Sequence, residues 1–319
     1  MKVVVLGAGA MGSLFGAMLV KAGNVETYMI DIWEEHVKTM NENGLTIQLS
    51  DKDEIIKPIY AFTSPEDVAK AMDGYADLII VFVKGMFTET AIEEARCIIG
   101  PDTVFMTTQN GVGNGGRLAM LVDPQKVYFG TTSEGSNILA PGKIRFTSEK
   151  KDTCTHLMPF EGDITEKLIE ICDLFTKAGL KTVASKEAEA LVWEKLTLNA
   201  IGNCMSVLLR LTPFVFINDA SGSGERLCEM MIDEIVAVAE AKGLDFDKER
   251  ISWVMPFMRK LDGYASMGFD AKNHKPTEID SINGAIAREG KKYGVPTPIN
   301  ETLYHMVNLV QNNYDKLWY

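Results

Sequence analysis

Short apolar runs alternate with amphipathic stretches through the first part of the chain. Several of these runs have the length and the continuous hydrophobicity of strands that are covered on both faces of a sheet. The predicted strands are Val3–Leu6, Thr27–Ile30, Leu78–Val83, Thr103–Thr107 and Val127–Thr131. Helical periodicity lies between most of them, at Met11–Ala22, Glu34–Asn43 and Thr88–Ile99. Strands that alternate with helices predict βαβ units, and therefore a parallel sheet with right-handed crossovers.

The pattern changes after about residue 132. A Pro141-Gly142 turn separates Asn137–Leu139 from Lys143–Phe146, which predicts an antiparallel pair of strands. Helical periodicity then dominates, in the segments Glu187–Leu209, Gly224–Lys242, Lys248–Leu261, Pro276–Tyr293 and Pro298–Asn312. Pro276 suits the first turn of its helix, and Gly294 suits a C-terminal stop. We therefore predict an α/β protein with two domains, an α/β domain over residues 1–185 and an all-helical domain over residues 186–319.

A glycine-rich turn follows the first predicted strand. The residues Gly7-Ala8-Gly9-Ala10-Met11-Gly12 have the spacing GxGxxG and open the first predicted helix. In a dinucleotide-binding turn Gly7 permits the tight bend, Gly9 lets the backbone approach a pyrophosphate, and Gly12 lets helix and strand pack closely. The start of the helix, at Ala10 and Met11, then offers N–H groups to the phosphates. The turn predicts a nicotinamide dinucleotide as the cofactor.

Asp31 stands nineteen positions beyond Gly12, at the end of the second predicted strand. A carboxylate there accepts hydrogen bonds from the adenosine ribose hydroxyls, whereas a 2′-phosphate would meet a like charge. The surrounding residues Ile30–Glu35 contain no lysine or arginine. We therefore expect NADH to be preferred, with NADPH as the alternative.

A polar stripe follows one predicted helix of the second half. Lys195, Asn199 and Asn203 are spaced at i, i+4 and i+8, so they line one side of an otherwise largely apolar helix. Asparagine is a mediocre helix former, so two in register call for an explanation. They are either part of a solvated face or a surface that binds a ligand, with amides for substrate oxygens and an ammonium that provides a proton.

Separated motifs along nearly the whole chain resemble those of the ketopantoate reductases (2-dehydropantoate 2-reductases). They are GAGAMG at Gly7–Gly12, Lys84 after an apolar strand, Gln109-Asn110-Gly111-Val112-Gly113-Asn114, Trp193-x-Lys195-x-x-x-Asn199-x-x-x-Asn203, Ser266-Met267-x-x-Asp270, Thr277-Glu278-Ile279-Asp280-x-Ile282-Asn283-Gly284 and Gly294-Val295-x-Thr297-Pro298. The resemblance implies an N-terminal Rossmann-type dinucleotide-binding domain, a C-terminal all-helical domain and a small anionic 2-oxo acid as substrate.

The resemblance also implies roles for individual residues. Lys195 matches the general acid that protonates the ketone oxygen, and Glu278 matches the acidic residue that orients this lysine and contacts substrate. Asn110 matches an asparagine near the nicotinamide and the reacting carbonyl. The remaining matches are groups that bind substrate, at Asn199, Asn203 and Ser266, and a lysine near the cofactor, at Lys84.

Composition restricts the partners. With 32 basic and 44 acidic residues the chain has a formal net charge of −12 at pH 7, which disfavours nucleic acid and anionic membranes as partners. The five cysteines are scattered and odd in number, which favours reduced thiols in a cytoplasmic protein. No Cys or His spacing indicates a metal site. A homodimer is compatible with the sequence.

Three functions remain open. The first is reduction of 2-dehydropantoate to D-pantoate in pantothenate and coenzyme A synthesis. The second is an NAD-dependent D-2-hydroxyacid dehydrogenase for branched or aromatic 2-oxo acids, which Asp31 and the bulky stretch Leu208–Phe214 would suit. Glu134, where family members often have histidine, is a further departure from the family pattern. The third is a non-catalytic NADH sensor, which would need neither Lys195 nor Glu278.

Overall fold

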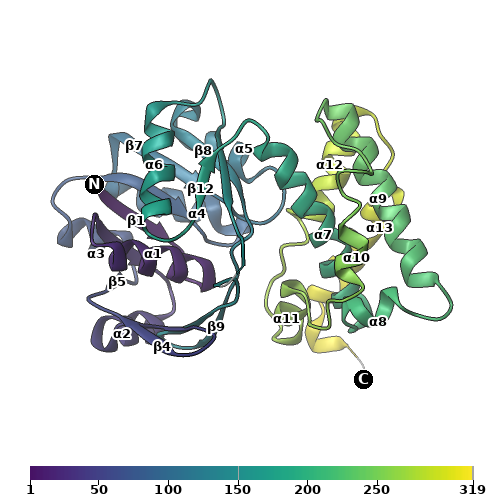
Figure 1. Cartoon of the computed structure of the whole chain (residues 1–319), viewed down its shortest axis with the longest axis horizontal. Coiled ribbons are helices and arrows are strands. Elements are labelled where there is room, and N and C mark those ends of the chain that lie inside the picture. Colours follow the sequence, from purple (N-terminus) through teal and green to yellow (C-terminus); the bar gives the residue numbers. More distant parts are fainter. Residues whose placement is uncertain (150, 318–319) are drawn as a thin grey trace. The chain divides into compact units, whose positions relative to one another are not determined.

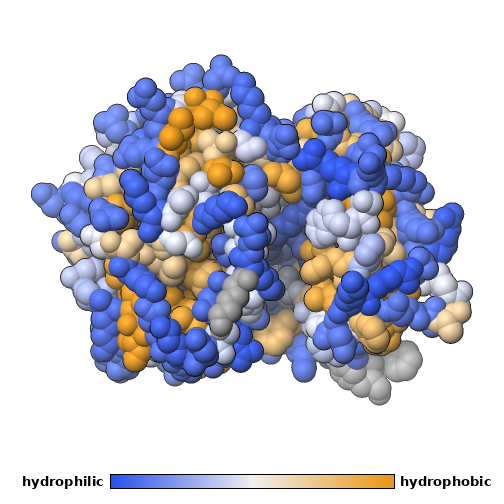
Figure 2. All heavy atoms as spheres, viewed as in Figure 1, coloured by the Kyte–Doolittle hydropathy of each residue, from blue (hydrophilic) through white to orange (hydrophobic). Residues whose placement is uncertain are grey.

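The computed structural model describes residues 1–149 and 151–317, which form two compact units. The first unit comprises the described residues of 1–109 and 114–188, and the second comprises residues 110–113 and 189–317. In Figure 1 the first runs from purple through blue to teal, and the helices of the second run from teal at α7 through green to yellow. In Figure 2 hydrophilic side chains cover most of the visible face of each unit, with apolar side chains in smaller patches. Each unit is described by itself below.

The first unit is built on an eight-stranded sheet. Its order is β12-β11-β8-β7-β6-β1-β2-β5, and only the β8–β11 neighbours run antiparallel. The strands are β1 (Lys2–Leu6), β2 (Glu26–Ile30), β5 (Tyr60–Phe62), β6 (Ala76–Val81), β7 (Ile99–Thr107), β8 (Val127–Thr132), β11 (Thr155–Pro159) and β12 (Thr182–Ala184). The predicted parallel sheet is confirmed, in the doubly wound arrangement that places ligand-binding loops at the carboxyl ends of the strands.

Helices cover both faces of this sheet, because successive side chains of each strand point to opposite sides. Val3 and Val5 of β1 belong to the same apolar core as α1 (Ala10–Ala22) and α6 (Glu166–Lys177). Val4 and Leu6 belong to the opposite core. That second core includes residues of α3 (Pro65–Ala71), the α4 (Thr88–Glu94) and η2 (Ala95–Ile98) region, and α5 (Asn114–Ala119). The strand that the continuous apolar run predicted is therefore buried by helices on both faces of the sheet.

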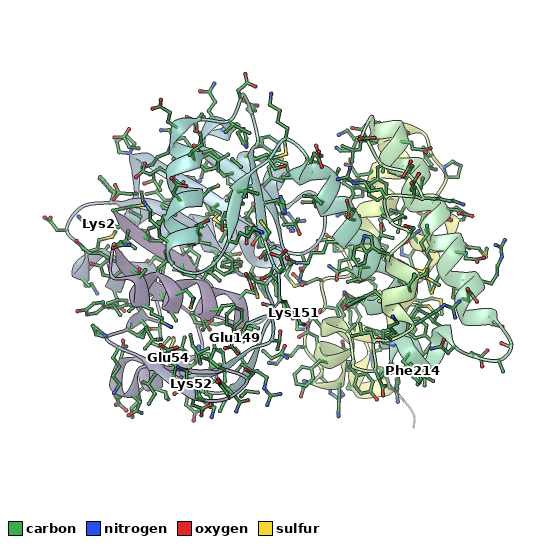
Figure 3. All side chains as sticks on the ribbon, viewed as in Figure 1. Lys2, Lys52, Glu54, Glu149, Lys151 and Phe214 are labelled. Atoms are coloured by element: carbon green, nitrogen blue, oxygen red, sulfur yellow. The ribbon has the colours of Figure 1, made fainter. Side chains whose placement is uncertain are left out.

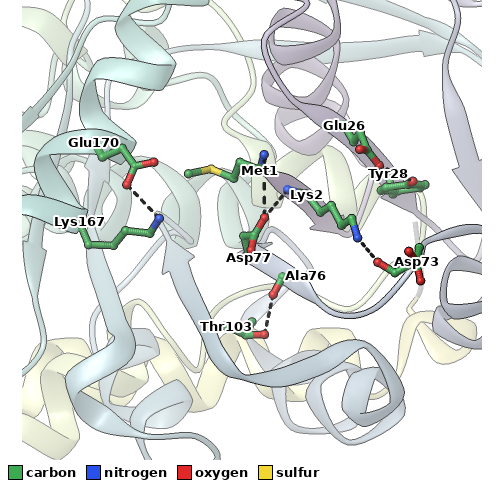
Figure 4. Close-up of polar contacts among 10 residues, drawn as sticks. All are labelled: Met1, Lys2, Glu26, Tyr28, Asp73, Ala76, Asp77, Thr103, Lys167 and Glu170. Atoms are coloured by element: carbon green, nitrogen blue, oxygen red, sulfur yellow. Dashed lines mark hydrogen bonds and ion pairs between the residues drawn. The ribbon is translucent and has the colours of Figure 1, made fainter.

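Polar contacts tie the amino ends of β1 and β6 to each other and the amino end of β6 to the middle of β7 (Figure 4). The backbone N–H of Lys2 donates to the carboxylate of Asp77 at 2.6 Å, and the hydroxyl of Thr103 donates to the carbonyl of Ala76 at 2.6 Å. These bonds fix the amino ends of β1 and β6 at the edge of the sheet opposite the glycine-rich turn, which follows the carboxyl end of β1.

A second, four-stranded sheet has the order β4-β3-β10-β9. Its strands are β3 (Leu45–Gln48), β4 (Asp53–Ile56), β9 (Ser136–Ala140) and β10 (Lys143–Phe146). The predicted antiparallel pair around the Pro141-Gly142 turn is confirmed as β9 and β10. In Figure 3 the side chains of Lys52, Glu54 and Glu149 lie around this sheet. Its pairing joins residues 45–56 to residues 136–146, so the loop regions after β2 and β8 support each other.

In the second unit the regular secondary structure of the described residues is helical. They are α7 (Ala188–Leu209), α8 (Pro213–Ile217), α9 (Ser223–Lys242), α10 (Val254–Met258), α11 (Ser266–Lys272), α12 (Asn283–Tyr293) and α13 (Pro298–Gln311). Trp193, Ile201 and Met205 of α7 are at most 2% exposed and share a core with α9, α12 and α13. Lys242 of α9 joins Glu189 and Glu289 through ion pairs of 3.2 and 3.3 Å. The prediction that the chain is helical from about residue 187 onward is confirmed, although the limits of individual helices differ.

Two predicted helices are wrong in extent. The segment 248–261 is helical only at Val254–Met258, where turns flank a five-residue helix that contains a proline. The segment 276–293 is helical only from Asn283, so Pro276 does not occupy the first turn of a helix. Residues 277–282 form a turn instead, in which the carbonyl of Glu278 accepts from the backbone N–H groups of Ser281 and Ile282. Gly294 does end α12, in the left-handed conformation expected of a C-terminal stop.

All five cysteines have free thiols. No helix in the described part of the chain combines the length and the apolar character that a bilayer crossing requires.

Candidate active site

The glycine-rich turn has the backbone that its spacing predicts. Gly7 has φ +92°, and a side chain there would press on the backbone N of Val83 at 2.6 Å. A Cβ at Gly12 would overlap the carbonyl oxygen of Gly7, so this position must stay bare for α1 to start where it does. A Cβ at Gly9 would meet nothing within 4 Å. The turn thus presents a bare backbone and open space at the one position where a pyrophosphate must come close.

Helix α1 supplies the donors for that space. It begins at Ala10 and runs for thirteen residues, and its N-cap Gly9 has no side chain to satisfy the first N–H groups. Its first turn contains no acidic residue. The N–H groups and the positive end of the helix dipole are therefore available to an anion, which fits the phosphates of a dinucleotide.

The side chain of buried His36 contacts the backbone of the glycine-rich turn at Ala8. The sequence analysis did not select His36 as a site residue. Its Nδ1 accepts from the backbone N–H of Gly142 at 2.9 Å, so its Nε2 carries the proton. Nε2 lies 3.0 Å from the carbonyl oxygen of Ala8 and 3.1 Å from the hydroxyl of Ser13. Burial lowers the pKa of His36 below its ordinary value, an effect that the nearby Asp31 opposes. A histidine on the apolar face of α2 (Glu34–Asn43) was the one available signal.

Asp31 follows β2 directly. Its backbone N–H donates to the carbonyl of Phe62 at 3.1 Å, and one of its carboxylate oxygens accepts from the N–H of Trp33 at 3.0 Å. Among the described residues no hydrogen bond or ion pair engages its other carboxylate oxygen. The first turn of α2 adds Glu34 and Glu35, so the charges next to Asp31 are acidic.

The loop that carries Lys84 is held by Gln109, which the sequence analysis did not select as a site residue. Strand β6 ends at Val81, two residues earlier than predicted, and Lys84 precedes a short turn of 3₁₀-helix. The amide of Gln109 donates to the carbonyl of Val83 at 2.5 Å and to the hydroxyl of Thr88 at 3.0 Å. Gln109 thus joins the loops that follow two adjacent parallel strands, β6 and β7, and holds the backbone of Val83 before Lys84 and the side chain of Thr88 after it.

The predicted stripe lies on α7, in the second unit. Burial lowers the pKa of Lys195 to about 8, and the carboxylate of Glu278 opposes that shift. Asn199, one turn later, is partly exposed, and its carboxamide makes no hydrogen bond within the described chain. The arrangement places a lysine with a lowered pKa one helical turn from an amide that makes no hydrogen bond in the described chain, which is the kind of cluster found at functional sites.

Asn203 continues the stripe and is 3% exposed. Its side-chain oxygen accepts from the hydroxyl of Ser266 at 3.2 Å and from the backbone N–H of Met267 at 3.0 Å. These contacts bring Ser266, at the start of α11, next to the stripe although the two are 63 positions apart.

Glu278 lies in the turn before α12, not at the start of a helix as the predicted span implied. The amide of Asn110 donates to its carboxylate at 3.4 Å. The structure therefore brings six predicted residues into the second unit, namely Asn110, Lys195, Asn199, Asn203, Ser266 and Glu278. Of the predicted cofactor residues, Gly7, Gly9, Ala10, Met11, Gly12, Asp31 and Lys84 lie in the first unit, whereas Asn110, predicted to contact both cofactor and substrate, lies in the second.

Glu134 does not join either group. It is 8% exposed, and its carboxylate accepts from the hydroxyls of Ser148 and Thr153 at 2.5 and 2.7 Å. These contacts give it a structural role in the first unit. Over the described residues no group of three His, Cys, Asp or Glu side chains could hold a metal ion.

Family models match both parts of the chain. One described as "Ketopantoate reductase PanE/ApbA" matches residues 3–157, and one described as "Ketopantoate reductase PanE/ApbA C terminal" matches residues 187–311. A protein of Streptococcus pyogenes serotype M6 named 2-dehydropantoate 2-reductase is 30% identical over 312 residues, with 97% of each chain covered. The protein of that name from Lactococcus lactis subsp. lactis is 30% identical over 318 residues, again with 97% of each covered.

Solved structures agree over nearly the full length. A PanE/ApbA family ketopantoate reductase from Ralstonia eutropha JMP134 is 26% identical with a TM-score of 0.86, and the match covers 99% of this chain and 100% of that one. A ternary structure of D-mandelate dehydrogenase with NADH and anilino(oxo)acetate is 28% identical with a TM-score of 0.85, again over 99% of this chain and 100% of that one.

Proposed function

This chain belongs to the ketopantoate reductase family, a family of nicotinamide-dependent oxidoreductases, and we propose that it reduces 2-dehydropantoate to D-pantoate. The observation that carries the proposal is Lys195, whose pKa burial lowers to about 8 beside the carboxylate of Glu278. A proton donor of ordinary lysine basicity would release its proton poorly at neutral pH. A lysine with a pKa near the working pH both gives up a proton and recovers it.

The residues of the second unit have separate tasks in this reaction. Reduction of a ketone leaves negative charge on the former carbonyl oxygen, and the Lys195 ammonium stabilises that charge and protonates the oxygen. The negative charge of Glu278 keeps the lysine protonated at the start of the cycle. The amides of Asn110, Asn199 and Asn203, with the hydroxyl of Ser266, bind and orient the oxygen atoms of the substrate.

The first unit holds the cofactor. A reduced nicotinamide supplies the hydride. The backbone of Gly7–Gly12 and the start of α1 would hold the pyrophosphate, and Lys84 would lie near the cofactor. The free carboxylate oxygen of Asp31 and the acidic residues beside it favour a ribose with two hydroxyls over one with a phosphate. We therefore propose NADH as the preferred cofactor, in line with the NADH found in the similar D-mandelate dehydrogenase structure.

A second candidate is a D-2-hydroxyacid dehydrogenase for branched or aromatic substrates. The likeness to D-mandelate dehydrogenase favours it, as do the bulky residues Leu208–Phe214. The third candidate, a non-catalytic NADH sensor, gives no reason for a lysine of lowered pKa beside a carboxylate. The five free thiols fit a reducing compartment, and we place the protein in the cytoplasm.

The proposal is tested by following NADH oxidation with 2-dehydropantoate, 2-oxoisovalerate, 2-oxoisocaproate and phenylglyoxylate. We expect the highest kcat/KM with 2-dehydropantoate. A much higher value with a branched or aromatic acid would replace the first candidate by the second. Binding of NADH without turnover of any substrate would leave only the sensor.

A further inference from the structure

Residues 110–113 belong to the second unit, although the chain on both sides of them belongs to the first. The chain leaves the first unit after Gln109 and returns to it at Asn114. Both ends of the excursion are therefore fixed in the nucleotide-binding half, while the residues between them are packed with the helical half. No local propensity explains this, because Asn-Gly-Val-Gly is an ordinary loop sequence.

Consecutive residues of this loop contact one turn of the second unit. The backbone N–H of Val112 donates to the carbonyl of Ser281 at 2.9 Å, and the Val112 side chain packs against the apolar core of that unit. Gly111 lies so close that a Cβ would overlap the same Ser281 oxygen, and its φ is +93°. The amide of Asn110 reaches the carboxylate of Glu278 at 3.4 Å. We call Asn110, Gly111 and Val112 the docking segment.

The turn that receives the docking segment is the one that carries Glu278. Its own backbone bonds run from Ser281 and Ile282 back to the carbonyl of Glu278, at 3.1 and 3.2 Å. Those bonds fix the backbone of Glu278 but not its side chain. The Asn110 amide contacts the Glu278 carboxylate from outside the turn, and its backbone is adjacent to Gly111 and Val112, which lie against Ser281.

We propose that the docking segment positions the carboxylate of Glu278 toward Lys195, so that residues from the nucleotide-binding half of the sequence set the protonation of the catalytic lysine. The inference rests on the proposed function, since it assigns positioning residues to the same site. Gly111 and Val112 touch neither substrate nor cofactor in this role. They act through Asn110 and Glu278, and the charge of Glu278 then raises the pKa of Lys195 against the effect of burial.

Two glycines of the loop make a matched pair for the test. Gly111 and Gly113 have φ +93° and +92°, so alanine meets the same unfavourable backbone conformation at both. At Gly111 the new methyl group also collides with Ser281, whereas at Gly113 it meets nothing within 4 Å. The difference between Gly111→Ala and Gly113→Ala therefore reports on docking alone. Val112→Ala is a milder variant that weakens docking by loss of packing.

The readout is the titration of Lys195, measured by the pH dependence of its labelling with an amine-reactive reagent in the protein without cofactor or substrate. Loss of an opposite charge a few ångströms away changes a pKa by roughly one unit or more. We expect Gly111→Ala to lower the pKa of Lys195 by about that much, Val112→Ala to lower it by less, and Gly113→Ala to leave it unchanged. The alkaline limb of kcat/KM for 2-oxo acid reduction, which reports the free enzyme, should move by the same amount.

The outcomes distinguish failure of the positioning role from failure of the proposed function. Equal pKa values for Lys195 in the wild-type protein, Gly111→Ala and Val112→Ala would overturn the positioning role, as would equal shifts in Gly111→Ala and Gly113→Ala. If Gly111→Ala does not fold, Val112→Ala against Gly113→Ala decides the matter. If no 2-oxo acid is reduced by the wild-type protein, the proposed function fails, while the labelling result still decides whether the docking segment acts on Lys195.

Discussion

The side-chain oxygen of Asn203 accepts a hydrogen bond from the backbone N–H of Met267, 3.0 Å away, and a second from the hydroxyl of Ser266 at 3.2 Å. Met267 lies in the first turn of α11, so Asn203 satisfies an N–H group that the helix itself cannot. One end of a buried carboxamide thus holds α11, and the other end, the NH₂ group, is the donor that we propose binds the substrate.

Replacement of Asn203 should separate these two roles. Asn203→Asp keeps the acceptor for Met267 but replaces the donor by a negative charge, so an anionic 2-oxo acid should bind at least about tenfold more weakly. Thermal stability should change little in this variant, whereas Asn203→Ala should lose both stability and affinity. Steady-state KM and thermal unfolding measure the two effects. Asn273→Asp, at the exposed end of α11, carries the same charge change and should leave KM unaltered.

The pH dependence should have opposite signs for the two directions of the reaction. Reduction needs the ammonium form of Lys195, so kcat/KM should fall as the pH rises through about 8. Oxidation of the 2-hydroxy acid needs the neutral amine, so its kcat/KM should rise over the same interval. Because the Glu278 carboxylate raises the pKa of Lys195, Glu278→Gln should move both limbs toward lower pH. If the pH profile of Glu278→Gln coincides with that of the wild-type protein, the titrating group is not Lys195.

Cofactor choice should depend on the charge of Asp31. Asp31→Asn removes the repulsion of a 2′-phosphate, and we expect the ratio of kcat/KM for NADPH to that for NADH to rise at least about tenfold. Glu35→Gln removes one nearby charge from the first turn of α2 and should change the ratio much less. Equal or greater efficiency of the wild-type protein with NADPH would contradict the assignment of NADH.

His36 should make stability dependent on pH in the mildly acidic range. Burial keeps its pKa in the folded protein below the unfolded value of about 6.5. As the pH falls below that value, the unfolded chain therefore takes up a proton that the folded one does not, and the free energy of unfolding decreases.

The variant His36→Phe leaves the buried N–H of Gly142 without its acceptor, at a cost of roughly 1–3 kcal/mol. That destabilisation should be largest above pH 6.5 and shrink below it. Denaturant unfolding at several pH values measures it, and His305→Phe, at an exposed position of α13, is the control. We also expect a higher Kd for NADH in His36→Phe, because the carbonyl of Ala8 loses one of its supports.

Hydrophobic periodicity predicted the strands and helices whose limits depend on their own residues. The apolar run at Val3–Leu6 and the glycine stop after α1 are found within a residue of their predicted limits. The helix predicted over 276–293 fails at its start because tertiary contacts, not propensity, decide residues 277–282. That turn closes on the carbonyl of Glu278 and is covered by a loop almost 170 positions earlier in the chain.

The site shows the same division. The GxGxxG turn and the i, i+4, i+8 stripe could be predicted because their geometry is contained in one strand–helix unit and one helix. The roles of His36 and Gln109 could not, because each residue acts through partners on other elements, such as Gly142 for His36 and Val83 for Gln109. The contact of Gly111 with Ser281 could not be predicted either, because it involves the backbone oxygen of Ser281 and not a side chain.

The catalytic role of Lys195 is tested most directly by kcat of Lys195→Ala with NADH and the preferred 2-oxo acid. A general acid typically contributes about 10²–10⁴-fold, so kcat should fall by at least about 10²-fold. The fold and the Kd for NADH should be retained, because the residues proposed to hold the cofactor lie in the other unit. Lys248→Ala, at an exposed lysine of the same unit, should keep full activity. Turnover by Lys195→Ala close to that of the wild-type protein would contradict the assignment of Lys195 as the proton donor.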